Sequence, residues 1–108
     1  MATYYDEIEV TENDYGQEVE FKCLVDDEEF DLTGYTVTFS MKSPRDSKSK
    51  VNKAQATVSD ATGGVIRYIW RFRDLSEPGV YKAIIRASKD GIVITFRGLT
   101  IIVREEEE

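Results

Sequence analysis

One stretch decides the fold: Asp60-Ala-Thr-Gly-Gly-Val-Ile-Arg-Tyr-Ile-Trp-Arg-Phe-Arg-Asp-Leu-Ser-Glu-Pro-Gly-Val-Tyr-Lys-Ala83. It begins with a turn at residues 60–64, whose glycines reach positive φ at little cost. A strand of alternating side chains follows, with Ile66, Tyr68, Trp70 and Phe72 on one face and Arg67 and Arg71 on the other. A corner at Pro78-Gly79 leads to Tyr81. Turn, alternating strand, corner and tyrosine in this order are typical of a β-sandwich.

Period-2 alternation continues along the rest of the chain, and no segment has a sustained helical period. We expect strands at residues 7–10, 18–25, 35–42, 53–59, 65–72, 80–88 and 92–103. Val25 and Phe72 are predicted to face inward, and residues 43–52 to form a polar, basic loop. Asp90-Gly91 is a favoured hairpin turn. A bulge or a short turn is expected near Gly98, because Arg97-Gly98 breaks the alternation of the last strand. The prediction is an all-β, immunoglobulin-like antiparallel β-sandwich of about seven to eight strands.

Size and composition fit a single domain. The chain has 108 residues, and its hydrophobic content of 41% and charged content of 32% are ordinary for a globular protein. We expect one domain over residues 1–104, followed by an acidic, disordered tail at residues 105–108, where four glutamates repel one another. No apolar run is long enough to cross a membrane, and the N-terminus lacks the basic and apolar regions of a signal peptide.

The chemistry of the chain argues against an enzyme. It contains no histidine, which removes Ser-His-Asp catalysis and the commonest zinc ligand. The single cysteine, Cys23, cannot form an internal disulfide, and Ala83 stands where a second inter-sheet cysteine would lie. We therefore expect Cys23 to be a small buried apolar residue, and we expect no catalytic, cofactor-binding or metal-binding residues.

Charge is unevenly spread along the chain. The net charge is −7, yet residues 1–41 hold twelve acids and one base, whereas residues 42–104 hold thirteen bases and five acids. The acidic total argues against general nucleic-acid binding. Two interpretations stay open: a solvated surface with chance segregation, or complementary faces on neighbouring copies that steer association.

Two charged segments are candidate interaction sites, although both also fit solvated loops. The basic set is Lys42, Arg45, Lys48, Lys50 and Lys53; the acidic set is Asp26, Asp27, Glu28 and Glu29. The acidic segment lacks the residue pattern of a calcium loop. The outward apolar side chains Leu24, Ile69 and Ile84 fall on strands that we expect to be neighbours, and would then mark a protein contact or packing under loops.

Three residues are predicted to have structural roles: Trp70, Gly79 and Tyr81. Tyr81, two residues after Gly79, is placed to form a tyrosine corner, in which the phenol bonds back to the backbone. Trp70 is expected to face the core.

A wider combination of motifs carries a family resemblance. An acidic turn precedes Leu-Thr-Gly and an alternating strand that ends in Met; Asp-Ala-x-x-Gly then precedes Tyr-x-Trp, and Gly-x-Tyr-x-Ala follows. These residues are Leu32, Thr33, Gly34, Met41, Asp60, Ala61, Gly64, Tyr68, Trp70, Gly79, Tyr81 and Ala83. Together with the final apolar strand, they resemble the N-terminal immunoglobulin-like domain of phage upper baseplate proteins over residues 17–103.

The resemblance implies a virion structural protein, made in the host cytoplasm, that contacts other virion proteins as a homo-oligomer or an assembly-dependent multimer. Neither nucleic acid nor membrane is an expected partner. Because this sequence ends after the sandwich, a small decoration or adaptor protein is a further expectation. The alternative is a carbohydrate-binding module for adhesion to the host surface, with Tyr4, Tyr5, Tyr15 and Trp70 as candidate sugar contacts.

Overall fold

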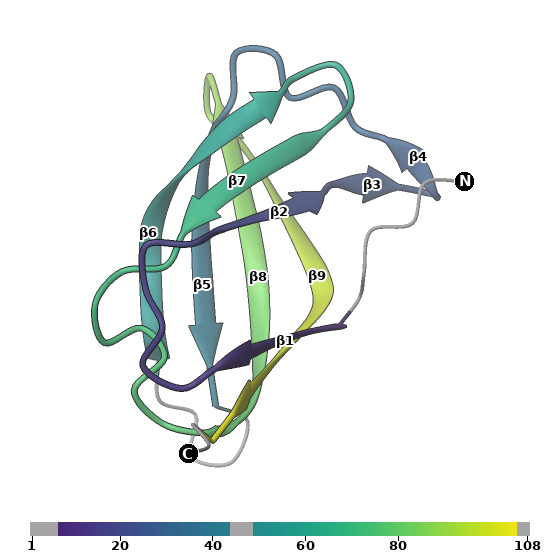
Figure 1. Cartoon of the computed structure of the whole chain (residues 1–108). Coiled ribbons are helices and arrows are strands. Elements are labelled where there is room, and N and C mark those ends of the chain that lie inside the picture. Colours follow the sequence, from purple (N-terminus) through teal and green to yellow (C-terminus); the bar gives the residue numbers. More distant parts are fainter. Residues whose placement is uncertain (1–6, 44–48, 106–108) are drawn as a thin grey trace.

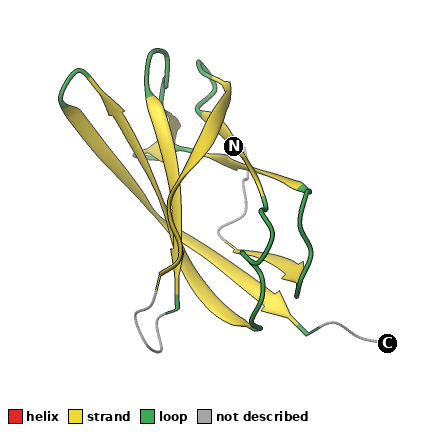
Figure 2. Ribbon diagram, turned by 90° about the vertical axis from the view of Figure 1, so that its left-hand side faces the viewer, coloured by secondary structure: helices red, strands yellow, loops and turns green. Residues whose placement is uncertain are grey.

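A computed structural model of the chain describes residues 7–43 and 49–105, which form nine strands and no helix (Figures 1 and 2). The strands are β1 (Glu7–Thr11), β2 (Glu18–Lys22), β3 (Leu24–Val25), β4 (Glu28–Glu29), β5 (Thr36–Lys42), β6 (Ser49–Asp60), β7 (Val65–Ile69), β8 (Gly79–Lys89) and β9 (Ile92–Arg104). The predicted all-β sandwich is confirmed. The strand count is higher than predicted because the strand expected at residues 18–25 is split at Cys23, and β4 pairs with its second piece.

Two layers share one long strand. The larger layer has the order β1-β9-β8-β5-β6, and β6 continues into the smaller layer, β6-β7-β2. The first part of β6 pairs with β5 and its last residues pair with β7, so the sandwich is closed like a barrel on this side. In Figure 1, β7 and β2 cross in front of β5, β8 and β9. On the other side β2 has no strand partner besides β7 among the described residues, and the layers are open to each other.

One pairing departs from the predicted antiparallel arrangement. β1 runs parallel to β9, with Glu7 opposite Thr100 and Thr11 opposite Arg104. Strand direction is set by the connections between the layers, and alternation within a strand carries no information about it.

The core lies between the layers and is centred on Phe39 of β5, which is fully buried. Its ring stacks on Tyr68 with centroids 4.7 Å apart and on Phe21 at 5.6 Å, and it meets Trp70 edge-on at 5.8 Å. Phe21, Tyr68 and Trp70 belong to the smaller layer or follow directly from it. Aromatic pairs in these geometries add to the free energy gained from burial.

Two side chains predicted to face inward are exposed. Val25 is 43% exposed because the turn at Asp26 and Asp27 folds β3 back onto β4 as a short hairpin. Phe72 is 67% exposed because the chain leaves β7 at Ile69 and turns. That turn is held by the buried Asp74 carboxylate, whose Oδ2 accepts from Tyr68 Oη at 2.5 Å and from the N–H of Arg71 at 2.8 Å.

The predicted loop at residues 43–52 is partly wrong. β6 begins at Ser49, and Val51 is buried opposite Met41. A bulge shifts the register between this pair and the pair of Phe39 with Ala54, and Lys53 takes up a φ of 55° there. The bulge interrupts the alternation, which is why the sequence pattern hid the first residues of the strand. Residues 44–48 lie outside the described part of the chain, as do residues 106–108 of the predicted disordered tail.

The predicted patch of outward apolar residues does not form. Leu24 and Ile69 belong to β3 and β7, but Ile84 lies on β8, which pairs with β5 and β9 in the larger layer. The strands expected at residues 18–25 and 65–72 do pair, through β2 and β7, but β8 is not their neighbour.

The turns that shape the larger layer are where the sequence placed them. Asp90 and Gly91 have φ of 50° and 83° and join β8 to β9 in a two-residue hairpin. At Gly98, whose φ is 99°, the register shifts by one residue between the pairs Ala83–Leu99 and Ile85–Phe96. The predicted hairpin and bulge are both confirmed.

The corner before β8 is held by a side-chain hydrogen bond. The Tyr81 hydroxyl donates to the carbonyl oxygen of Glu77 at 2.9 Å, while its ring is buried. Gly79, at a φ of 151° that L side chains rarely adopt, starts the strand. This hydrogen bond ties the loop between the layers to the strand that follows it.

We predict that Tyr81→Phe lowers the free energy of unfolding by about 1 kcal/mol, because one intramolecular hydrogen bond is lost while the buried ring is kept. Urea unfolding followed by the fluorescence of Trp70 measures the change. Tyr15→Phe removes a hydroxyl from a 59% exposed side chain and is the matched control, expected to change stability by less than about 0.5 kcal/mol. Equal stability of Tyr81→Phe and the wild type would contradict this role of the corner.

Two buried groups make stability depend on alkaline pH. Burial raises the pKa of the Cys23 thiol to about 12. Burial, and then the hydrogen bond to Asp74, raises the pKa of Tyr68 to about 12. Each group stays neutral in the folded chain at a pH where it ionises in the unfolded chain, so its contribution is complete at neutral pH and is lost as pH rises toward 12.

We therefore predict that the free energy of unfolding falls between about pH 9 and pH 12, with a slope near 1.4 kcal/mol per pH unit for each group over its own range. In Cys23→Ala, the decrease in the free energy of unfolding that begins near the ordinary pKa of a thiol should be absent. The decrease caused by Tyr68 should remain. A Cys23→Ala variant with the same pH dependence as the wild type would overturn this assignment.

Candidate docking surfaces

The outer face of the larger layer is basic over β5 and β8. β5, β8 and β9 contain no Asp or Glu. Lys42 and Lys82 stand opposite each other on β5 and β8, and Arg86 stands opposite Thr38 four pairs further along, on the same face. Lys53 lies beside them on β6, where its N–H donates to Ser40 Oγ at 2.9 Å. We call Lys42, Lys53, Lys82 and Arg86 the basic face.

Hydroxyl groups hold these long side chains over the sheet. Lys82 Nζ donates to Thr100 Oγ1 at 3.2 Å, and Arg86 Nε donates to Thr95 Oγ1 at 3.4 Å. Because no carboxylate takes part in these contacts, the basic face keeps its positive charge for a partner. Sequence reasoning missed Lys82 and Arg86, although their alternation with the buried Tyr81, Ala83, Ile85 and Ala87 already placed them on the outside.

Not every residue of the predicted basic set belongs to this face. Lys42 and Lys53 are exposed there, but Lys50 is half-buried and its ammonium donates to Ser76 Oγ. Arg45 and Lys48 lie outside the described residues. Arg104, at the end of β9, is paired with Glu9 of β1, and hydrogen bonds from its guanidinium, then its charge, lower the pKa of Glu9.

The predicted acidic set forms the tip of the β3–β4 hairpin. Asp26 and Asp27 have φ of 54° and 66°, the left-handed values that a two-residue turn of this type needs. All four members are exposed. Among the described residues, Glu29 alone of the four forms an ion pair, between its Oε2 and Lys22 Nζ at 2.6 Å. The turn therefore presents Asp26, Asp27 and Glu28 to solvent.

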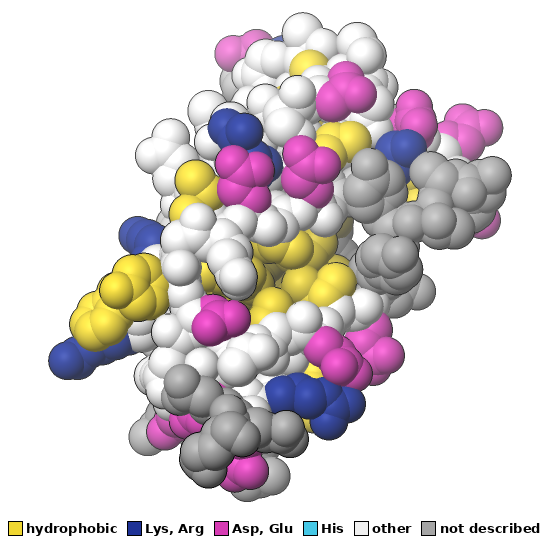
Figure 3. Space-filling model, viewed as in Figure 1, with side chains coloured by type: hydrophobic (Ala, Val, Ile, Leu, Met, Phe, Trp, Pro, Cys, Tyr) yellow, Lys and Arg dark blue, Asp and Glu magenta, His cyan; other side chains and the backbone are white. Residues whose placement is uncertain are grey.

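The outer face of the smaller layer carries two exposed acids. Glu18 and Glu20 project from β2 and are exposed, and Arg67 of β7 lies 3.7 Å from Glu18. Figure 3 is viewed from this side and shows Asp and Glu side chains over both the upper and the lower half of the molecule, with Lys and Arg side chains among them. The sandwich thus carries acids on β2 and the hairpin, and bases on the far face of the larger layer.

An exposed aromatic pair stands apart from both charged surfaces. Tyr15 and Phe72 are 59% and 67% exposed and meet edge to face, with centroids 5.4 Å apart and planes at 81°. The guanidinium of Arg73 lies 5.5 Å from the centre of the Phe72 ring. Of the predicted sugar contacts, Tyr15 is exposed, Trp70 is buried at 2% exposure, and Tyr4 and Tyr5 lie outside the described residues.

Over residues 7–43 and 49–105, no group of three or more His, Cys, Asp or Glu side chains is arranged to hold a metal ion. The same residues include no helix that is long and apolar enough to span a membrane. The only cysteine, Cys23, is 1% exposed.

Comparison with known proteins gives a clear family. No curated protein matches this sequence. Residues 3–108 match the family described as the BppU N-terminal domain, the N-terminal domain of baseplate upper proteins, so the match covers nearly the whole chain. The resemblance seen in the sequence is therefore confirmed. This chain belongs to the BppU N-terminal domain family and is a structural domain of a phage baseplate.

Proposed function

We propose that this domain works by protein–protein contact in the baseplate, and that its basic face docks on acidic surfaces of neighbouring virion proteins, other copies of the chain among them. Its family supports a place in the virion and contact with other virion proteins. The chemistry of the described residues supports binding rather than catalysis, since the one thiol is buried and the chain has no histidine. Synthesis in the host cytoplasm before assembly belongs to the same proposal.

One observation carries the proposal: a chain of net charge −7 keeps three adjacent strands, β5, β8 and β9, free of acids. Opposite charges on facing surfaces speed the encounter of two proteins and select their relative orientation. The basic face would then meet acids such as Asp26, Asp27, Glu28 and Glu29 of a neighbour. Arg45 and Lys48, three and six residues after Lys42 in the sequence, would extend the proposed contact, whereas the ammonium of Lys50 is held by Ser76.

A second candidate function is carbohydrate binding in host-surface adhesion. The observation that favours it is the Tyr15–Phe72 pair, since exposed aromatic rings are common sugar contacts. The edge-to-face angle of 81° gives no flat platform for a sugar ring, so we place this candidate second. A glycan array on which the protein binds nothing would remove it.

The proposed docking predicts that Lys42→Glu/Lys82→Glu abolishes the salt-sensitive part of the association with baseplate partners or with itself. Reversing two charges that face each other should weaken this association at low salt at least about tenfold, equivalent to about 1.4 kcal/mol. Sedimentation velocity at low and high salt measures it, with and without the other baseplate proteins.

Lys42→Arg/Lys82→Arg is the matched control, because it keeps both charges at the same positions and should assemble like the wild type. Unchanged low-salt association of Lys42→Glu/Lys82→Glu would contradict docking through the basic face. So would a wild-type chain whose association does not respond to salt.

A further inference from the structure

β9 has an open edge beside its apolar half. It pairs with β8 along its length, but with β1 only from Thr100 to Arg104. Residues 92–99 therefore lack a second strand among the described residues. The sequence Ile92-Val93-Ile94-Thr95-Phe96 along this edge has no charge and no proline, and Ile92 and Val93 are 54% and 58% exposed. Edge strands usually carry a charged residue or a proline, because a free edge can otherwise pair with a strand of another chain.

Backbone N–H and C=O groups along this edge are oriented for pairing with another strand. Lys89 and Ile92 flank the two-residue turn and form the first hydrogen-bonded pair of the hairpin. Hydrogen-bonded and non-hydrogen-bonded pairs alternate in an antiparallel ladder. Val93 and Thr95 therefore direct their N–H and C=O groups away from β8, toward the open side.

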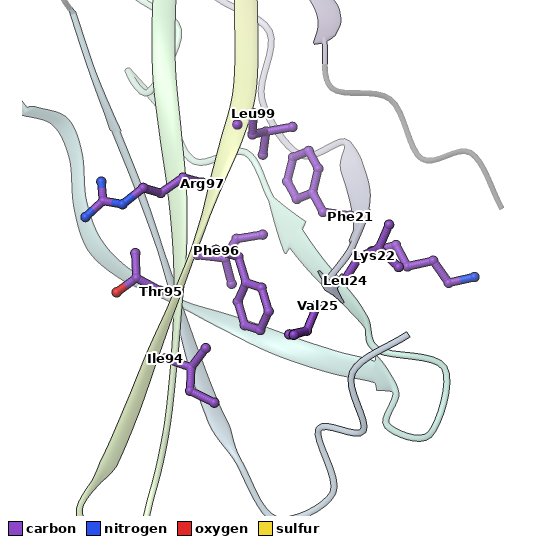
Figure 4. Close-up of a pocket in the computed structure, with 11 residues that line it drawn as sticks. Phe21, Lys22, Leu24, Val25, Ile94, Thr95, Phe96, Arg97 and Leu99 are labelled. Carbon is purple, nitrogen blue, oxygen red and sulfur yellow. The ribbon is translucent and has the colours of Figure 1, made fainter. Parts of the chain in front are cut away.

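A groove of about 310 Å³, lined by apolar side chains and also by Lys22, Thr95 and Arg97, lies next to the edge. Phe21 and Leu24 line it from the smaller layer, and Ile94, Phe96 and Leu99 line it from β9. Figure 4 shows Ile94, Phe96 and Leu99 on the groove side, with Thr95 and Arg97 pointing away. A strand added at the edge would cover apolar side chains and satisfy backbone groups together.

We propose that the occupant is β9 of a second copy of this chain, paired antiparallel about a two-fold axis at Ile94. In this register Val93 lies opposite the partner's Thr95, and each pair exchanges both backbone hydrogen bonds. Ile94 lies opposite the partner's Ile94, and Ile92 lies opposite the partner's Phe96. The groove-facing side chains of the two copies then form one continuous apolar row.

Charge complementarity at the ends of the paired stretch favours a second copy over an unrelated strand. The same register places Arg97 opposite the partner's Gly91, beside the partner's Asp90. Asp90 and Arg97 are both exposed, and neither forms an ion pair with another residue of the described part of the chain. Because the dimer is two-fold symmetric, the contact between Arg97 and the partner's Asp90 occurs twice. An unrelated strand would need its own acidic and basic residue at the two matching positions.

This pairing does not depend on the basic face. It joins apolar side chains and backbone groups, so high salt should preserve it. Salt screening weakens contacts between exposed charges. The two proposals can therefore fail independently.

A disulfide tests the register. Opposed residues of a non-hydrogen-bonded antiparallel pair have Cα atoms about 4.5 Å apart, within the range that a disulfide spans. Ile94→Cys should therefore form a covalent dimer under mild oxidation, at low and at high salt. Ile92→Cys is the matched control: it lies on the same side of the same strand, but four residues away from its symmetry mate, and should cross-link at least about tenfold less. The native Cys23 is buried and leaves the wild type monomeric on a non-reducing gel.

Ile94→Cys that stays monomeric at the highest soluble concentration, or Ile92→Cys that cross-links equally, would overturn the proposed pairing. Cross-linking that appears only after another baseplate protein is added would also overturn it, because the occupant would then not be a second copy. Val93→Pro tests the non-covalent dimer independently, by sedimentation velocity. The substitution removes an N–H group that faces the open side of β9 and leaves the hydrogen bonds between β8 and β9 in place. Its non-covalent dimer should be lost while the fluorescence of Trp70 stays native.

Discussion

Packing of Phe39 against aromatic rings of the smaller layer joins the two halves of this sandwich. Phe39 is fully buried and touches Phe21, Tyr68 and Trp70, which come from parts of the chain far apart in sequence. Burial of a side chain of this size contributes a few kcal/mol, a large share of the net stability of a small domain. Because these rings fill the interior, the outer faces of both layers are left to solvent and to partners.

The alternation of side chains along β5 and β8 determines which residues pack in the core and which face outward. On β5, Val37, Phe39 and Met41 point inward and are buried, so Thr38, Ser40 and Lys42 point outward. On β8 the buried Tyr81 and Ala83 bracket the outward Lys82. Pairing of the two strands then places Lys42 beside Lys82. A basic face thus follows from the register that packs the core.

Much of the fold could be predicted from local chemistry. Alternation predicted strands where β5, the later part of β6 and β8 lie, and glycine marked the hairpin at Gly91 and the irregularity at Gly98. The family resemblance rested on residues of the core and corners, among them Trp70 and Tyr81. These features depend on neighbours in the sequence or on the two faces of a single strand, which a single sequence displays.

What could not be predicted depends on pairing between distant segments. Phe72 continues the alternation of β7 in the sequence, but the Asp74 carboxylate turns the chain before that residue is reached. The bulge at Lys53 hid the start of β6. Lys82 and Arg86 became candidate contacts only once β8 was seen beside β5. Register between strands depends on turns and bulges as well as on alternation, and so it required the structure.

The most direct test of this account compares Phe39→Ala with Phe96→Ala by urea unfolding. If the interior between the layers is tightly filled at Phe39 and open at the groove beside β9, Phe39→Ala should cost about 3–5 kcal/mol. Phe96→Ala, which removes an equal volume from a partly exposed side chain, should cost at most about 2 kcal/mol. Equal losses for the two variants would contradict the account, because the groove would then be packed as closely as the core.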